Sequence, residues 1–163
     1  MLTDEEIVSK ALSEDIHHYG LLVERYADYL FGLGMRLTSG DSSLSKDIAQ
    51  QTFLNSFTYL KSFNTKKKYK PWLTGIAINC FKDLRRDQRE FANEVDANEL
   101  QSGPDAEDFS EFYRLIKPLS DEERPLFVLK YIYGFKDNEI ATISDQKVGT
   151  VKSKLSRALE KLR

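Results

Sequence analysis

Near its C-terminus the chain reads Asp137-Asn138-Glu139-Ile140-Ala141-Thr142-Ile143, Ser144-Asp145-Gln146-Lys147, Val148-Gly149-Thr150-Val151-Lys152-Ser153-Lys154-Leu155, the segment with the clearest structural pattern. The spacing of its apolar residues predicts two short helices, near 137–143 and 148–162, joined by a turn. The inward side of the second helix is expected to hold Val148, Val151, Leu155, Leu159 and Leu162. Its opposite side holds Thr150, Ser153, Lys154 and Arg157. The segment therefore predicts a packed helix pair whose outer face is polar and basic.

This outer face carries the side chains that DNA-reading helices use. Short hydroxyl side chains, lysine and arginine suit phosphate contacts, and lysine and arginine can also contact the edge of a guanine. The pair therefore resembles a helix-turn-helix, in which the second helix enters the major groove. The alternative is a solvated outer face on the last helix of a bundle.

Helical spacing also extends over most of the upstream chain, with predicted helices near 22–37, 44–60, 71–84, 112–119 and 120–133. The buried side of the second of these helices is expected to hold Ala49, Phe53, Phe57 and Leu60. Ser120 and Glu123 have the spacing of a capping box. Pro125 is expected to distort the first turns of its helix.

The fold class predicted is all-α, because no segment shows the period-two alternation of a strand. Residues 91–110 are acidic and poor in large apolar residues, and they include Gly103-Pro104, which is typical of a linker. We therefore expect two small helical domains, residues 1–90 and 111–163, joined by a flexible acidic linker over residues 91–110.

Composition excludes several classes of protein. The chain has 163 residues, of which 40% are apolar and 31% charged, as in a globular protein. Its one cysteine, Cys80, allows neither an internal disulfide nor a cysteine-based metal site. The N-terminus lacks the pattern of a signal peptide, and no stretch is apolar enough for a membrane helix. We expect a cytoplasmic protein.

The net charge of −2 argues against a nucleic-acid partner until the charges are located. Residues 61–90 hold nine basic and three acidic residues, a net charge of +6, and residues 146–163 hold six and one, a net charge of +5. Residues 91–124 hold three and ten, a net charge of −7. Two basic blocks are therefore separated by an acidic tether, which can shield either basic face in the free chain.

The first basic block combines lysines with aromatic residues, a mixture that suits single-stranded DNA. Lys82, Arg85, Arg86 and Arg89 form a basic stripe along the helix that begins near Pro71, and the preceding segment, 63–72, alternates lysines with rings. The alternative is a solvated basic loop beside core aromatics, and Trp72 is expected to be mostly core.

A third surface lies on the predicted helix 44–60. Asp47, Gln50, Gln51 and Leu54 share one stripe, opposite Phe53 and Phe57. A polar stripe that ends in an apolar residue suits a partner helix, although it also suits an ordinary exposed face.

Together these residues resemble a family. The segments Asp47-Ile48-Ala49-Gln50-Gln51-Thr52-Phe53 and Tyr69-Lys70-Pro71-Trp72-Leu73, with Asp83-Leu84-Arg85-Arg86, resemble region two of bacterial RNA polymerase sigma factors. Leu119-Ser120, Glu139-Ile140-Ala141 and Gly149-Thr150-Val151-Lys152-Ser153-Lys154-Leu155 resemble region four. With little beyond these two regions, the chain is similar to the extracytoplasmic-function (ECF) group.

The resemblance implies a non-enzymatic transcription initiation factor with no cofactor and no small-molecule substrate. It implies binding to core RNA polymerase, at the β′ coiled coil and the β flap, and to promoter DNA. An anti-sigma factor, often membrane-embedded, is a further implied partner.

The resemblance also assigns residues to each surface. The β′ coiled coil would be bound by Asp47, Gln50, Gln51 and Leu54. The minus-ten element would be bound by Phe63, Lys66, Lys67, Lys68, Tyr69, Trp72, Asn79, Lys82, Arg85 and Arg86. The minus-thirty-five element would be bound by Lys147, Thr150, Lys152, Ser153, Lys154 and Arg157.

The chain departs from the family pattern most clearly at the turn between the last two helices. Asp145-Gln146-Lys147 replaces the usual Gly-Ile-Ser. Aspartate tolerates a left-handed backbone better than most residues, but Gln146 loses an apolar contact and Lys147 is a poor helix cap.

Nothing in the sequence points to catalysis. His17 and His18 are adjacent and would point in different directions on a helix, and no ligand set has metal-site spacing.

Two alternatives stay open beside a sigma factor. One is a regulator that binds duplex DNA as a dimer without polymerase, and the other is a degenerate sigma-like protein that only titrates a partner.

Overall fold

The computed structural model describes residues 1–94 and 110–163, and every regular element within these ranges is helical. The N-terminal part contains α1 (Asp4–Ser13), a 3-10 turn (Ile16–His18), α2 (Tyr19–Leu37), α3 (Ser42–Thr58), a second 3-10 turn (Leu60–Ser62) and α4 (Tyr69–Glu94). The prediction of an all-α fold is confirmed for the described residues.

Local signals fix where these helices begin. Thr3 caps α1 by accepting a hydrogen bond from the Glu6 N–H, and Asp41 caps α3 by accepting one from the Leu44 N–H.

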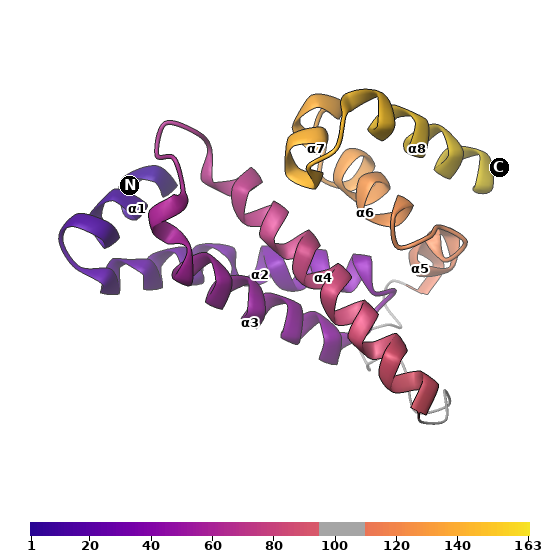
Figure 1. The fold of residues 1–163 in the computed structure, drawn as a ribbon, viewed down its shortest axis with the longest axis horizontal. Helices are drawn as coiled ribbons and strands as arrows, with labels where there is room; N and C mark the ends of the chain where they lie inside the picture. Colours follow the sequence, from indigo (N-terminus) through magenta and orange to yellow (C-terminus); the bar gives the residue numbers. More distant parts are fainter. Residues whose placement is uncertain (95–109) are drawn as a thin grey trace.

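In Figure 1, α2, α3 and α4 lie alongside one another and form the N-terminal bundle. Helix α4 continues to Glu94, four residues into the range expected to be a linker. Most of the predicted linker lies outside the described residues.

The predicted buried side of α3 is wrong in part. Ala49 and Phe53 are only half-buried and Phe57 is 45% exposed, although Leu60 is buried as expected. The side that packs against the bundle instead holds small, hydroxyl-bearing and aliphatic residues: Leu44, Ser45, Ile48, Thr52 and Ser56.

Close packing of α2 against α3 explains this choice of side. A Cβ atom on Gly34 of α2 would lie 3.0 Å from the Ser45 Cα, so the two backbones approach through small residues. Burial of hydroxyls at this contact is tolerated because they bond within their own helix. The Thr52 hydroxyl donates to the Ile48 carbonyl at 2.6 Å, and the Ser45 hydroxyl donates to the Asp41 carbonyl at 2.7 Å.

The C-terminal part contains α5 (Ser110–Ile116), α6 (Glu123–Phe127), a π-helical turn (Val128–Ile132), α7 (Asp137–Ser144) and α8 (Val148–Lys161). The capping box before α6 is confirmed, because the Ser120 N–H donates to the Glu123 carboxylate and the Glu123 N–H donates to the Ser120 hydroxyl. Gly134, with φ of 76°, follows the π-helical turn in the left-handed conformation.

The expected effect of Pro125 is wrong in position. Helix α6 begins at Glu123, so Pro125 lies in its first turn, where a missing N–H leaves no helix bond unmade. The departure from α-helical geometry comes later, in the π-helical turn at Val128–Ile132.

The two parts of the chain pack against each other through α4 and α7 (Figure 1). A Cβ atom on Gly75 of α4 would lie only 3.0 Å from the Ile143 carbonyl oxygen of α7. Beside this contact, the Tyr29 and Tyr133 rings meet edge to face with centroids 5.3 Å apart, and the Arg36 guanidinium donates to the Tyr133 hydroxyl at 3.0 Å. Glycine at position 75 therefore permits the close approach of the two helices.

Candidate nucleic-acid and protein interfaces

Helix α8 presents most of its predicted DNA-contacting residues to solvent. Exposed side chains on its outer face and N-terminus are those of Lys147, Thr150, Lys152, Ser153 and Arg157. The sixth, Lys154, is half-buried and lies 3.1 Å from a Glu122 carboxylate oxygen. The inward side is formed by Val151, Leu155 and Ala158. Val148, expected to face inward, is 39% exposed, because it is the first residue of the helix and lies beyond the packed contact.

The turn before α8 has helix-turn-helix geometry although Asp145-Gln146-Lys147 replaces the usual residues of the family. Asp145 takes the left-handed conformation, with φ of 53° and ψ of 50°, and the Gln146 N–H donates to the Ala141 carbonyl at 2.9 Å. The poor helix cap expected at Lys147 is confirmed, and Gln146 shows a weakness of a different kind from the lost apolar contact that was expected. Lys147 makes no side-chain cap, and the Gln146 Oε1 is buried without a hydrogen-bond partner. The turn therefore keeps a helix-turn-helix at the cost of one unsatisfied acceptor.

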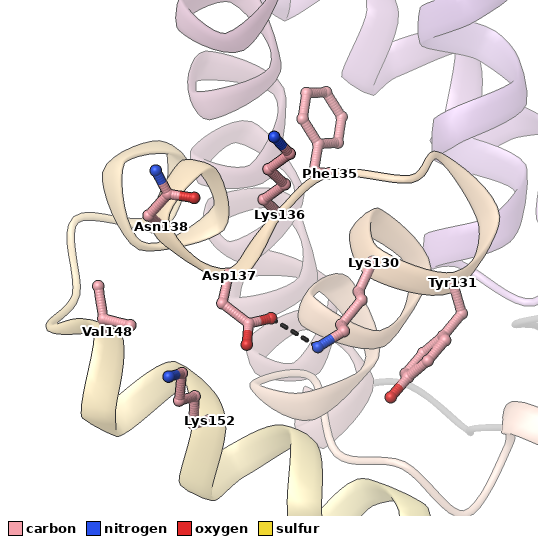
Figure 2. A pocket seen from close by; sticks show the side chains of 8 residues that line it. All are labelled: Lys130, Tyr131, Phe135, Lys136, Asp137, Asn138, Val148 and Lys152. Carbon is pink, nitrogen blue, oxygen red and sulfur yellow. Dashed lines mark hydrogen bonds and ion pairs between the residues drawn. The ribbon is translucent and has the colours of Figure 1, made fainter.

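A shallow hollow lies between the π-helical turn and the starts of α7 and α8 (Figure 2). Lys130, Lys136 and Lys152 line it, and the only carboxylate on its wall, Asp137, accepts a hydrogen bond from the Lys130 ammonium at 2.7 Å. This hydrogen bond raises the pKa of Lys130 above its usual value. The hollow extends the cationic surface of α8 towards the preceding turn.

The predicted minus-ten residues lie along α4 and in the loop before it. Lys66, Lys67, Lys68 and Asn79 are exposed, whereas Phe63 and Tyr69 are buried and Trp72 is half-buried. The three rings form one cluster: the Phe63 centroid lies 5.5 Å from that of Tyr69 and 5.1 Å from that of Trp72. The aromatic cluster supports the lysine loop, and Trp72 is the least buried of its three rings.

A groove of about 560 Å³ runs between this surface and α7. On one side it is lined by residues of the predicted minus-ten surface, including Lys67, Trp72 and Asn79, and by the neighbouring Ile76. On the other side lie Asn138, Glu139, Thr142 and Ile143 of α7. Helix α7 therefore covers part of the predicted minus-ten surface.

Two carboxylates that sequence reasoning did not assign to any surface lie against the basic residues of α4. Asp121 pairs with Arg85 at 3.8 Å, with Arg124 at 3.2 Å and with Arg89. Glu122 pairs with Lys82 at 3.8 Å and with Lys154 at 3.1 Å. The hydrogen bond from Lys154 lowers the pKa of Glu122. The signal in the sequence is the acidic run Asp121-Glu122-Glu123, in which local spacing identifies a role only for Glu123, as a helix cap.

The outer face of α3 is open. Asp47, Gln50, Gln51 and Leu54 are all exposed, Leu54 to 58%. The apolar end of the stripe is larger than predicted because Phe57, 45% exposed, and Tyr59, 61% exposed, follow it. Their aromatic side chains at an exposed helix end are the signal that could have found them.

Among residues 1–94 and 110–163, no group of three or more metal-ligating side chains comes together. The Asp15 carboxylate accepts a hydrogen bond from His17 Nδ1, and the Asp15 carbonyl accepts one from His18 Nδ1, so both histidines have local structural partners. No helix in the described part of the chain has the length and hydropathy to span a membrane.

Two family models match the chain in tandem. The model of Sigma-70 region 2 matches residues 22–91, and the model of Sigma-70, region 4 matches residues 109–162. The chain is 29% identical to the "ECF RNA polymerase sigma-E factor" of Escherichia coli K12, over 98% of this chain and 92% of the relative. It is also 29% identical to the sigma-E factor of Haemophilus influenzae, over 98% and 93%.

Two solved structures share the fold. CnrH in complex with the cytosolic domain of CnrY is 22% identical, with a TM-score of 0.73 over 98% of this chain and 94% of that one. RpoE from Bartonella quintana in complex with the anti-sigma factor NepR is 23% identical, with a TM-score of 0.68 over 88% and 93%. Both likenesses concern the arrangement of helices.

Proposed function

This chain belongs to the sigma-70 factors of the ECF group, and from that premise we propose how its surfaces divide the work of transcription initiation. It directs core RNA polymerase to specific promoters and assists promoter opening. The observation that carries this conclusion is the presence of regions two and four in tandem, in a chain that aligns over nearly the full length of sigma-E factors.

Residues 1–90 form the region-two domain of this proposal and hold its polymerase-binding surface. The outer face of α3 supports that assignment, because its polar stripe and exposed apolar end suit a partner helix. Asp47, Gln50 and Gln51 supply the polar contacts to the β′ coiled coil, and Leu54 supplies the apolar anchor. Phe57 extends the anchor.

The loop before α4 and the exposed side of α4 bind the minus-ten element in this proposal. Lysines at 66–68 attract the phosphates of the separated strand, and the half-buried Trp72 ring is the place where an unstacked base can stack. The buried Phe63 and Tyr69 rings act beneath the loop as its support.

Residues 111–163 form the region-four domain, whose helix α8 enters the major groove of the minus-thirty-five element. Arg157 and Ser153 lie exposed on the face that the helix-turn-helix turns outward. The β flap of the polymerase is the proposed protein partner of this domain, and residues 91–110 connect it to region two.

Two further features belong to the proposal. The chain carries out no bond chemistry of its own, and it acts in the cytoplasm, where core polymerase meets the chromosome. CnrH and RpoE are named in complexes with partner proteins, the latter an anti-sigma factor, and we propose an anti-sigma partner for this chain too.

Run-off transcription with purified core polymerase over a promoter library tests the proposed function. We expect initiation at a subset of promoters that share two sequence elements, and none when either the chain or core polymerase is left out. Binding to a duplex that is equally strong with and without core polymerase, together with no transcript, would instead identify a polymerase-independent regulator. Binding to core polymerase without any transcript would identify a protein that only titrates its partner.

A further inference from the structure

One carboxylate connects the two basic surfaces of the chain. The Glu122 oxygens lie 3.8 Å from the Lys82 ammonium of α4 and 3.1 Å from the Lys154 ammonium of α8. Next to it, the Asp121 carboxylate contacts the guanidinium groups of Arg85 and Arg89 on α4. A single turn before α6 therefore supplies anions to both of the surfaces that we assign to promoter DNA.

These carboxylates form ion pairs with the cationic groups that a DNA phosphate would contact. Charge-assisted hydrogen bonds from lysine or arginine form equally with carboxylate and phosphate oxygens. A DNA backbone that approaches Lys82 or Lys154 must therefore displace Glu122 first. Both lysines are half-buried in this arrangement, unlike the exposed Arg157.

Contacts other than ion pairs also hold the same arrangement in place. The Arg124 guanidinium, buried in region four, donates to the Leu37 carbonyl of α2 at 3.3 Å. The Ile143 backbone of α7 lies against Gly75 of α4, and α7 covers one side of the groove lined by Asn79 and Trp72. The two domains therefore meet over an interface that combines ion pairs with close backbone packing.

The arrangement is incompatible with simultaneous reading of a two-part promoter. Elements centred about 25 base pairs apart are separated by roughly 80 Å of duplex. Lys82 and Lys154 instead reach the same carboxylate, so the two DNA-contacting surfaces lie next to each other. One domain must move away from the other before both elements can be bound.

We propose that the acidic turn Asp121-Glu122 is a built-in clasp: it holds the free chain closed, shields the basic faces of α4 and α8, and must open before promoter DNA binds. The inference rests on the proposed DNA-binding function, and adds to it an intramolecular competitor for DNA within region four. Opening exposes Lys82, Arg85 and Lys154 together, so the gain in DNA affinity and the separation of the domains are one event.

Glu122 is the residue to change, because Asp121 also neutralises the buried Arg124 and its loss would endanger the fold. Glu122→Gln removes the anion and keeps the shape. The matched control is Glu160→Gln on α8, which changes the net charge equally at an exposed residue that takes part in no ion pair among the described residues. Dyes on Lys46→Cys and Ser156→Cys report the separation of α3 and α8 by energy transfer.

We expect Glu122→Gln to lower energy transfer in the free chain and to raise its affinity for a random-sequence 30-base-pair duplex about two- to fivefold above the Glu160→Gln control. Unchanged energy transfer would overturn the clasp, and opening without a gain over the control would overturn its shielding role. Thermal melting checks that both variants stay folded. Run-off transcription by the unmodified chain tests the proposed function separately. If that function is wrong, the unmodified chain gives no transcript, whatever the result for Glu122→Gln.

A second variant tests closure without touching a charge. Gly75→Ala adds a Cβ atom 3.0 Å from the Ile143 carbonyl, and alanine is at the same time the better helix former. We expect it to lower energy transfer while the melting temperature of region two is kept or raised. Energy transfer equal to that of the unmodified chain would contradict the close α4–α7 contact in solution.

Discussion

The two faces of the N-terminal bundle are in opposite states. The outer face of α3 is free of ion pairs to the C-terminal domain among the described residues, and its apolar end stands open to solvent. The basic side of α4 is instead partly covered by α7 and paired with the carboxylates of Asp121 and Glu122. In the closed arrangement the proposed polymerase-binding face is accessible, whereas the proposed DNA-binding face is paired with carboxylates and partly covered. This difference implies an order in which polymerase binds first and DNA second.

The largest expected effect concerns the open face. Replacing Leu54 by aspartate puts a charge at the apolar end of the proposed polymerase contact, and we expect affinity for core polymerase to fall about 50-fold, in the range of interface hot spots. Lys46→Ala, on an exposed part of the same helix, is the control and should change it little. Competition for core polymerase against a labelled sigma factor measures the difference. Equal affinities would remove α3 from the interface.

The next effect concerns the exposed part of the proposed DNA-binding face. Arg157 pairs with no acid among the described residues, so Arg157→Ala removes a DNA contact without opening the clasp. We expect about tenfold weaker use of the upstream promoter element by the holoenzyme, because one good base or phosphate contact is worth about 1–3 kcal/mol. Run-off transcription measures this with unchanged core binding as the control.

Lys154→Ala distinguishes the occupied part of the same face. We expect weaker promoter use by the holoenzyme, as for Arg157→Ala, but lower energy transfer in the free chain, because Glu122 loses its partner at 3.1 Å. Arg157→Ala should leave energy transfer unchanged. The same behaviour from both variants would mean that the two side chains do not differ as the structure indicates.

A smaller effect isolates the turn before α8 from the domain contact. Gln146→Leu removes a buried acceptor without a partner and restores an apolar side chain, so we expect the free energy of unfolding of region four to rise by about 1 kcal/mol. Urea unfolding followed by circular dichroism measures it. A decrease would show that the Gln146 amide makes contacts essential to the turn.

The smallest effect is on pH. The pKa of Glu122 is lowered in the closed chain, first by the hydrogen bond from Lys154 and then by the charges of Lys82 and Lys154. The ionised Glu122 carboxylate stabilises the closed arrangement fully at pH values above 4.5, the ordinary pKa of a glutamate. This stabilisation is lost as the pH falls through the lowered pKa of Glu122 and the carboxylate is protonated. Energy transfer in the unmodified chain should therefore fall below pH 4.5 more steeply than in Glu122→Gln. Parallel curves would exclude Glu122 as the titrating group.

Local sequence patterns predicted the elements well where each pattern concerns one helix. The starts and ends of α7 and α8, the capping box of Ser120 and Glu123, and the left-handed Asp145 all depend on neighbours within a few residues. The buried side of α3 was missed because it depends on α2: small residues such as Ser45 face inward only where Gly34 lets the helices approach. The same dependence on packing turned Phe57 outward.

The amino-acid order is enough to predict the helical class, the two regions, the family and the three groups of residues proposed to bind polymerase and DNA. Which of those groups are open and which are occupied depends on how the helices pack. Glu122 meets Lys82 and Lys154 because α4 and α8 pack on either side of its turn, and no spacing along the chain encodes that meeting. Periodicity reports the face of one helix, whereas an ion pair between distant segments exists only once packing has set the distance between them.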